Sequence, residues 1–262
     1  MKKALSALFS GLLCCCCPGA HAKPQSLYQV STISALAKRV YDGDIAYREV
    51  MKHGNFGLGT FADLDGEMVA LDGHFYRVDT KGRLEHVQPH LIAPFVEVTH
   101  FRPMKKQSLS EARSYQALGD ALRPLFSNAN MPYAIRIDGE FPLIQLRNVC
   151  KQKKPYPSLV EVSKTQATFE LKNVKGTLVG FWFPQYWAGI GVPGFHFHFV
   201  TDKRDLGGHV SELHLNHGQL QLNMIDKIDV QLPHHATFAN AHLSDEKCQA
   251  ELKKAEGGHR ER

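Results

Sequence analysis

Beyond its first residues, the sequence lacks any long run of apolar residues, and it has no internal repeat, low-complexity tract, Walker motif or dinucleotide-binding glycine motif. These absences argue against a membrane-spanning protein, a solenoid and the common nucleotide-binding enzymes. The sequence also has no large excess of charge of one sign. Without Lys2 and Lys3 it contains 29 basic and 26 acidic residues. The resulting net charge of +3 is too small to suggest nucleic-acid binding.

Cysteine is scarce outside the beginning of the chain. Four of the six cysteines form one run, Cys14 to Cys17, and only Cys150 and Cys248 lie further along. Two cysteines do not make a disulfide scaffold, so an apolar core must hold the fold, and a hydrophobic content of 43% is ordinary for a soluble globular protein. Whether Cys150 and Cys248 pair stays open.

The N-terminal residues match a secretory signal peptide. Lys2 and Lys3 form a basic region, residues 4–17 form an apolar region too short to cross a bilayer comfortably, and Ala20-His21-Ala22 forms an A-x-A cleavage site. We expect residues 1–22 to be removed near Ala22 and the mature chain to be exported to the periplasm or the medium. Lipidation at one of the early cysteines is less favoured, because Leu13 precedes Cys14 where a small residue is usual.

The rest of the sequence reads as many short strands and few helices. Apolar residues with a helical period predict helices over 31–40, 45–53 and 110–126, the last with Ser110 as N-cap. Turn residues between apolar runs predict three hairpins, at 72–73, 138–139 and 173–176, and further strands over 91–101 and 219–232. The predicted fold class is therefore α+β and sheet-rich, with mixed or antiparallel sheets. The basic segment 151–155, which ends in proline, is the best candidate for a linker, so we expect an N-terminal α+β subdomain over 23–150 and a β-rich subdomain with the metal site over 151–262.

The most informative segment alternates phenylalanine with histidine. In residues 194–199, His196 and His198 project to one face of a strand, and the phenylalanines face the other way. A polar loop at 202–205 and two glycines predict an antiparallel return that sets His209 opposite His198. Three imidazoles meeting at one point leave a fourth tetrahedral position open, which is the pattern of a catalytic zinc site.

A histidine pattern is not by itself a metal site. The chain has 15 histidines, and a lone histidine on a strand is more often a surface residue or a hydrogen-bonded core residue. The metal hypothesis therefore depends on the third histidine in pairing register. We interpret the histidines that follow in the hairpin and a later loop as solvated or structural: His214, His217, His234 and His235.

Two charged residues are candidates to complete such a site. Glu67 lies at the mouth of a glycine-containing turn that leads into a strand, and Arg147 interrupts an otherwise apolar strand. A carboxyl group can supply a proton and a guanidinium can bind an anionic substrate. On spacing alone, a structural role for each stays the alternative, since an isolated strand arginine is usually an edge charge with a buried stem.

Five segments stand in a fixed order along the chain: HGNFGLGTF at 53–61, LDGEM at 64–68, NVKGTLVGF at 173–181, VPGFHFHF at 192–199 and GGHV at 207–210. In this combination they resemble the bacterial α-acetolactate decarboxylase family, and the resemblance covers nearly all of the mature chain. It implies a two-part fold of mixed sheets and a homodimer.

Carried over residue by residue, the resemblance places the family's zinc ligands on His196, His198 and His209. Its active-site glutamate and arginine match Glu67 and Arg147. A second glutamate near the family's C-terminus matches Glu256, with Glu246 and Glu251 as alternatives, because the segment after Phe238 aligns only with a one-residue shift.

The activity that the resemblance implies is zinc-dependent decarboxylation of (S)-2-acetolactate to (R)-acetoin and carbon dioxide. A metal-stabilised enediolate would be protonated on one face, with Glu67 and Glu256 as the acid/base pair and Arg147 orienting the carboxylate. Which glutamate donates the proton stays open. The cofactor is Zn²⁺ and the partner is the small-molecule substrate, with no nucleic acid, and no membrane after processing.

Two other functions remain as alternatives. A cupin-type metal-dependent oxygenase also uses a His-x-His strand and a later histidine, but usually with a glutamate shortly after the pair, where this chain has Asp202 and Lys203. A non-catalytic exported metal-binding protein would explain the histidines but would need neither Glu67 nor Arg147. An iron requirement with oxygen consumption would favour the first alternative, and indifference to Glu67→Gln would favour the second.

Overall fold

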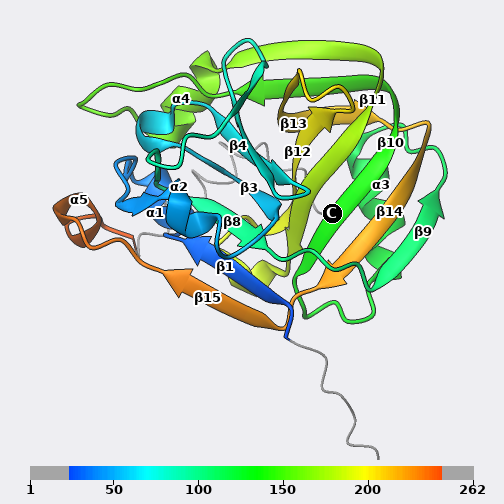
Figure 1. Ribbon diagram of the computed structural model, residues 1–262, viewed down its shortest axis with the longest axis horizontal. Coiled ribbons are helices and arrows are strands. Elements are labelled where there is room, and N and C mark those ends of the chain that lie inside the picture. Colours follow the sequence, from blue (N-terminus) through cyan, green and yellow to red (C-terminus); the bar gives the residue numbers. More distant parts are fainter. Residues whose placement is uncertain (1–23, 244–262) are drawn as a thin grey trace, which may run out of the picture.

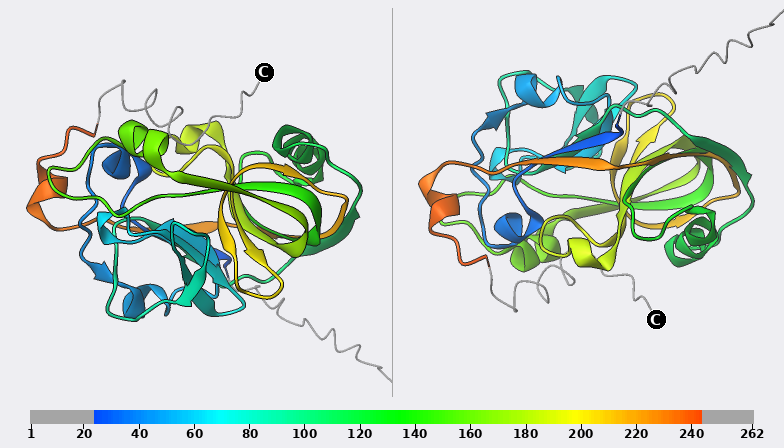
Figure 2. Two further views of the ribbon diagram at one scale, coloured as in Figure 1. Left: turned by 90° about the horizontal axis from the view of Figure 1, so that it is seen from above. Right: turned by 90° about the horizontal axis from the view of Figure 1, so that it is seen from below.

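The computed structural model describes residues 24–243, which are built mainly from two β-sheets (Figure 1). Views from above and below show an elongated molecule, with the strands of the first sheet toward one end and most of the second sheet toward the other (Figure 2). No helix within residues 24–243 is long and apolar enough to cross a membrane. This architecture confirms the predicted sheet-rich α+β class.

The first sheet has seven strands in the order β15-β1-β8-β3-β4-β5-β6, and only β1 and β15 pair in parallel. Asp72 and Gly73 both have positive φ, as the predicted two-residue hairpin between β4 and β5 requires. The bounds are β1 (Ser26–Val30), β3 (Phe56–Thr60), β4 (Glu67–Leu71), β5 (His74–Val78), β6 (Leu84–His86), β8 (Val96–Thr99) and β15 (Lys227–Gln231). The predicted strand over 91–101 divides into β8 and β7 (Ile92–Ala93), which pairs with β2 (Ile45–Ala46).

The second sheet has six strands in the order β11-β12-β13-β10-β14-β9, and β10 also pairs with β11. The four strands β10 to β13 therefore form a closed ring, which removes two exposed sheet edges. The bounds are β9 (Lys105–Leu109), β10 (Tyr133–Asn148), β11 (Ala167–Phe183), β12 (Gly194–Thr201), β13 (Gly207–His214) and β14 (His217–Met224). The predicted strand over 219–232 covers most of β14 and β15.

Two of the predicted hairpins are wrong. Residues 138–139 and 173–176 lie inside the continuous strands β10 and β11, which pair with each other over nearly their whole length. In this pairing Gly139 lies opposite Gly176, and the Thr177 hydroxyl donates a hydrogen bond to the Asp138 carboxylate (2.7 Å). The residues that predicted the two turns, at 138–139 and 173–176, thus pair with each other within one long two-stranded β10–β11 ladder.

Closure of the ring explains why turn-type residues lie within these strands. The β10–β11 ladder must bend, and Asn173 takes a left-handed φ of 52° within β11. Gly176 allows β12 to approach closely, because a Cβ atom there would lie 2.4 Å from the carbonyl oxygen of Val200. Sequence signals that are typical of a chain reversal therefore mark a bend and a close contact here.

The predicted helices are shorter in the structure. The α-helices within residues 24–243 are α1 (Ile33–Ala37), α2 (Tyr47–Val50), α3 (Tyr115–Leu122), α4 (Leu159–Thr165) and α5 (Ala236–Ala239). Of these, α4 and α5 were not predicted. The predicted N-cap Ser110 is wrong: Ser114 caps α3 by accepting a hydrogen bond from the Ala117 amide. The residues between them cannot be helical, because Ala112 forms a β-bridge with Leu215. The predicted helix over 45–53 keeps only α2, because its first residues pair as β2.

A shared core joins the two sheets. Leu58 and Val69 of the first sheet pack in one apolar cluster with Val179 and Phe181 of β11, and β4 lies against β12 and β13. Each sheet takes strands from both sides of residue 150, since β15 belongs to the first sheet and β10 to the second. The division into subdomains over 23–150 and 151–262 stays a prediction.

Candidate metal centre

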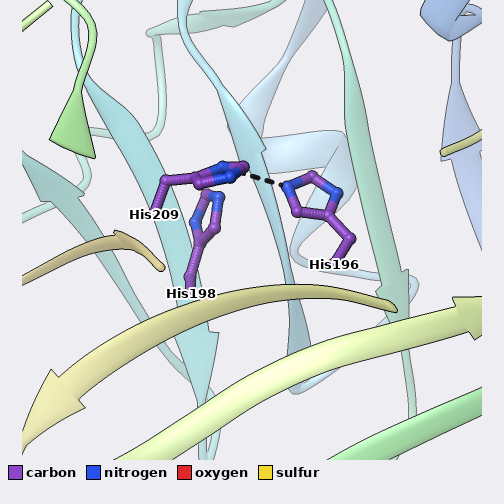
Figure 3. A group of neighbouring side chains, drawn as sticks. All are labelled: His196, His198 and His209. Carbon is purple, nitrogen blue, oxygen red and sulfur yellow. Dashed lines mark hydrogen bonds between the residues drawn. The ribbon is translucent and has the colours of Figure 1, made fainter. Parts of the chain in front are cut away.

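Three histidines meet on one face of the ring. His196 and His198 lie on β12, and His209 lies on β13 directly opposite His198, which confirms the predicted strand pairing. The neighbouring Phe197 and Phe199 point to the other face and are buried in the core of the second sheet. Figure 3 shows the three imidazoles turned toward one another.

The cluster is compact and buried. A ligand atom from each ring lies within 4.8 Å of the others, and His196 Nε2 lies 3.2 Å from His209 Nδ1, the contact drawn in Figure 3. His198 is 1% exposed, and His196 and His209 are each 7% exposed. Such a group of nitrogen ligands, shielded from water, has the composition and spacing of a protein metal site.

Burial keeps two of the three rings, His196 and His198, uncharged. It lowers the pKa of His196 to about 3, and the positive charge of Arg147 acts in the same direction. Burial also lowers the pKa of His198 well below its usual value, helped by His196 and Arg147 and opposed by a hydrogen bond to the Met68 carbonyl. Both rings are therefore neutral at pH 7, and a neutral imidazole is the form that binds a metal.

The first sheet fixes the orientation of His198. Because a carbonyl oxygen can only accept, the His198 Nδ1–H donates to the Met68 carbonyl oxygen at 2.9 Å. The lone pair of His198 is then on Nε2, which lies 3.7 Å from Glu67 Oε2. Bonds of this kind to the second ring nitrogen are typical of metal-binding histidines. The donor set and its support therefore fit a metal ion held by His196, His198 and His209.

The structure brings Glu67 and Arg147 to the same place. Glu67 begins β4, and the Val149 amide donates to its Oε1 at 3.4 Å. Arg147 lies on β10 opposite His209, and its Nη2 lies 2.6 Å from His209 Nε2. Both residues are buried. The two candidates therefore converge on the histidines from different strands.

These residues line an open pocket of about 540 Å³, including the space at its mouth. The histidines, Glu67 and Arg147 supply polar groups to its lining. The apolar part of the lining comes from α1, α4 and nearby segments: Ile33, Leu36, Leu64, Phe95, Val149 and Leu159. A pocket with both polar and apolar lining suits a small substrate with both acidic oxygens and alkyl groups.

Sequence reasoning missed part of this lining. Thr60, Ser163 and Gln166 also border the pocket, and nothing in their local pattern distinguishes them from ordinary strand or helix residues. Two of the histidines that were expected to be solvated or structural do not line the pocket: His214 contacts Glu111, and His217 is exposed. Glu256 and its alternatives Glu246 and Glu251 lie outside the described residues, as does Cys248, so the pairing of Cys150 stays open.

Comparison with known proteins identifies the family. The family model described as alpha-acetolactate decarboxylase matches residues 27–245. The chain belongs to this family. The α-acetolactate decarboxylase of Brevibacillus brevis is 43% identical over 218 residues, which are 83% of this chain and 76% of that protein. The Methanosarcina mazei enzyme of the same name is 40% identical over 230 residues, 88% of this chain and 80% of that protein.

Family members of known structure share the fold. The crystal structure of the Bacillus subtilis strain 168 α-acetolactate decarboxylase matches with a TM-score of 0.86 and 38% identity, covering 88% of this chain and 99% of that one. A Staphylococcus aureus protein described as similar to α-acetolactate decarboxylase matches with a TM-score of 0.84 and 26% identity, covering 88% and 100%. The resemblance seen in the sequence is thereby confirmed. Membership of an enzyme family also speaks against a non-catalytic metal-binding protein.

Proposed function

We propose that this protein decarboxylates (S)-2-acetolactate to (R)-acetoin and carbon dioxide, with Zn²⁺ bound by His196, His198 and His209. The observation that carries the proposal is that a member of the α-acetolactate decarboxylase family unites three buried imidazoles, an arginine and a glutamate in one pocket. Three neutral histidines with an open position are the ligand set of catalytic zinc sites. When bound, the metal would supply positive charge that polarises the ketone and stabilises the electrons released as carbon dioxide leaves.

Arg147 would hold the substrate carboxylate. Its guanidinium is permanently charged, lies in the pocket beside His209, and offers donors in a fork that matches two carboxylate oxygens. Because the side chain is buried, its charge acts across little water and therefore strongly. This placement would orient the bond between C1 and C2 of the substrate for cleavage.

Glu67 would move the proton that completes the reaction. When the C1–C2 bond breaks, its electron pair becomes the C2–C3 double bond and the ketone oxygen takes the negative charge. Acetoin then requires one proton at C2. Glu67 reaches the pocket from β4, and its carboxylate is oriented by the Val149 amide. A proton delivered from this side alone would give one enantiomer, and Glu256 is the proposed second member of the acid/base pair.

The assay for this function is acetoin formation from racemic acetolactate. The purified mature chain would be tested as isolated, after chelation and after restoring Zn²⁺, with chiral chromatography of the product. We expect activity that chelation abolishes and zinc restores, with (R)-acetoin in excess. Folded, zinc-loaded protein that forms no acetoin would overturn the proposal, and oxygen consumption in the same assay would favour the oxygenase alternative.

We also propose that the mature chain is exported and acts as a homodimer, as the family resemblance implies. Sedimentation velocity of the mature chain would show twice the monomer mass. A monomer at micromolar concentration would contradict the dimer without affecting the proposed reaction.

A further inference from the structure

Gln166 occupies a fixed position at the edge of the pocket. It is the residue between the end of α4 and the start of β11, with extended backbone angles (φ −64°, ψ 150°). Two residues later, Thr168 pairs with Arg147 across the β10–β11 ladder. This pairing places Gln166 next to the part of β10 that carries the arginine.

The Gln166 side chain contacts the guanidinium directly. Its Oε1 accepts a hydrogen bond from Arg147 Nη1 at 3.3 Å, while Nη2 of the same group lies 2.6 Å from His209 Nε2. Because a guanidinium is planar, partners on two of its nitrogens determine both its direction and the tilt of its plane. Gln166 therefore contributes to the orientation of a charge that faces the candidate metal centre.

The helix that ends at Gln166 is well anchored. Ser158 and Glu161 form a capping box at the start of α4. Leu159 and Val162 on this helix are buried in one cluster with Ile33 and Leu36 of α1. Gln166 is thus held by a capped, packed helix on one side and by a β-ladder on the other, so its amide has little freedom to move away from Arg147.

We infer that Gln166 is a positioning residue, which fixes the guanidinium of Arg147 in the orientation that receives the substrate carboxylate. This inference rests on the proposed function, because it assigns Gln166 a role through Arg147. The expected effect is catalytic and not structural. A misdirected guanidinium would still carry its charge, but the substrate bond would be poorly aligned for cleavage.

Two nearly isosteric variants separate hydrogen bonding from packing. Gln166→Met keeps the volume and removes the acceptor, and we expect kcat/KM to fall about tenfold, the lower end for a hydrogen bond to a charged group. Gln166→Glu keeps an acceptor oxygen, so kcat should return to within about threefold of the original value, while repulsion of the anionic substrate raises KM. The matched control is Gln145→Met on the exposed face of β10, where the glutamine contacts Glu170.

Combining Gln166→Met with Arg147→Ala completes a double-mutant cycle. If Gln166 acts through the arginine, Gln166→Met should have almost no further effect in that background. Zinc content and melting temperature of each variant would confirm that the fold and the metal site persist. Unchanged kcat/KM in Gln166→Met, or an equal loss in the Arg147→Ala background, would overturn the inference. An original chain that forms no acetoin would instead overturn the proposed function.

Discussion

The chemistry of the centre depends on which nitrogen of each ring carries the proton. The carbonyl of Met68 takes the Nδ1 proton of His198, which leaves the Nε2 lone pair on the side of Glu67. A backbone carbonyl cannot titrate or rotate away as a side chain can, so this tautomer is fixed by the packing of β4 against β12. The neutral His198 ring is therefore held with the Nε2 lone pair that a metal ion would bind facing the pocket side of β12.

Removing one of the three ligands should empty the site. For His196→Ala, His198→Ala and His209→Ala we expect bound zinc to fall from roughly one ion per chain to under about a tenth, because two imidazoles hold the ion far more weakly than three. The rise in melting temperature that zinc gives the original chain should vanish as well. His217→Ala, at an exposed position on β14, is the control. Full zinc occupancy in all three variants would refute the assignment of ligands.

Glu67 and Arg147 should matter for turnover more than for metal binding. We expect Glu67→Gln and Arg147→Ala to keep zinc and to lose about 10²-fold or more in kcat, since one lacks the acid/base group and the other the charge that holds the carboxylate. Steady-state kinetics and metal analysis of the same samples would check this. Glu170→Gln, the same change on β11 outside the pocket lining, should behave like the original chain. Unaltered turnover in both variants would remove these residues from the mechanism.

At the scale of the element, β11 is constrained in sequence where it packs against β12. It holds β12, with both histidines of the His-x-His motif, against the rest of the ring. At Gly180, an added Cβ would lie 2.2 Å from the carbonyl oxygen of His196. Any side chain there must push away the strand that carries two of the three ligands.

Gly180→Ala should therefore weaken the fold and the metal site together. We expect a loss of about 1–3 kcal/mol in the free energy of unfolding, as for other overpacked positions, with weaker zinc binding. Denaturant unfolding and zinc titration would measure the two effects. Gly73→Ala is the matched control, because its strain comes from a φ of +82° in a turn with open space around it. That variant should lose stability but keep its zinc affinity, and equal zinc affinity in both variants would contradict the argument.

Asp42 anchors the segment after β10 through contacts with Lys154 and Tyr156. The carboxylate accepts hydrogen bonds from Lys154 (2.6 Å), Tyr156 (3.1 Å) and Thr237 (3.1 Å). Burial raises the pKa of Asp42, but these hydrogen bonds outweigh burial and the net pKa is lowered. A carboxyl group with a lowered pKa in the folded state stabilises the fold above its unfolded pKa, near 4, and loses this contribution as the pH falls through the folded value.

Asp42→Asn should consequently cost stability at neutral pH and little in acid. We expect a loss of about 1–2 kcal/mol at pH 7, the range for a few hydrogen bonds to a partly exposed charge. The difference from the original chain should shrink as the pH falls below about 4. Thermal unfolding from pH 3 to 8 would measure it, with Asp202→Asn in an exposed loop as control. A difference that is the same at every pH would mean that the charge of Asp42 is not the cause.

Over the whole molecule, the features that could be predicted from the sequence are those set by residues close together in the chain. The features that could not be predicted depend on contacts between residues far apart in the chain. The histidine hairpin was predictable because strand alternation and a short loop decide its geometry locally. The course of β10 and β11 was not, because Gly139 and Gly176 acquire their meaning only when the two strands face each other. Gln166 was missed for the same reason: its contact with Arg147 depends on tertiary packing. Glu67 was a candidate from its turn alone, but only the family resemblance assigned it to the site, since it reaches the pocket from the other sheet.

At the scale of the whole molecule, the proposed export makes a prediction about residues 1–22. Cleavage after Ala22 would leave β1 intact, because that strand begins at Ser26 and lies between β8 and β15 in the first sheet. We therefore expect a chain without residues 1–22 to keep the melting temperature, zinc content and acetoin formation of the exported protein. Mass spectrometry of the exported protein should find Lys23 at its N-terminus. A different N-terminus, or a lipid attached to one of the early cysteines, would replace cleavage at Ala22 by another processing route. Loss of stability on removing residues 1–22 would show instead that the N-terminal segment belongs to the fold.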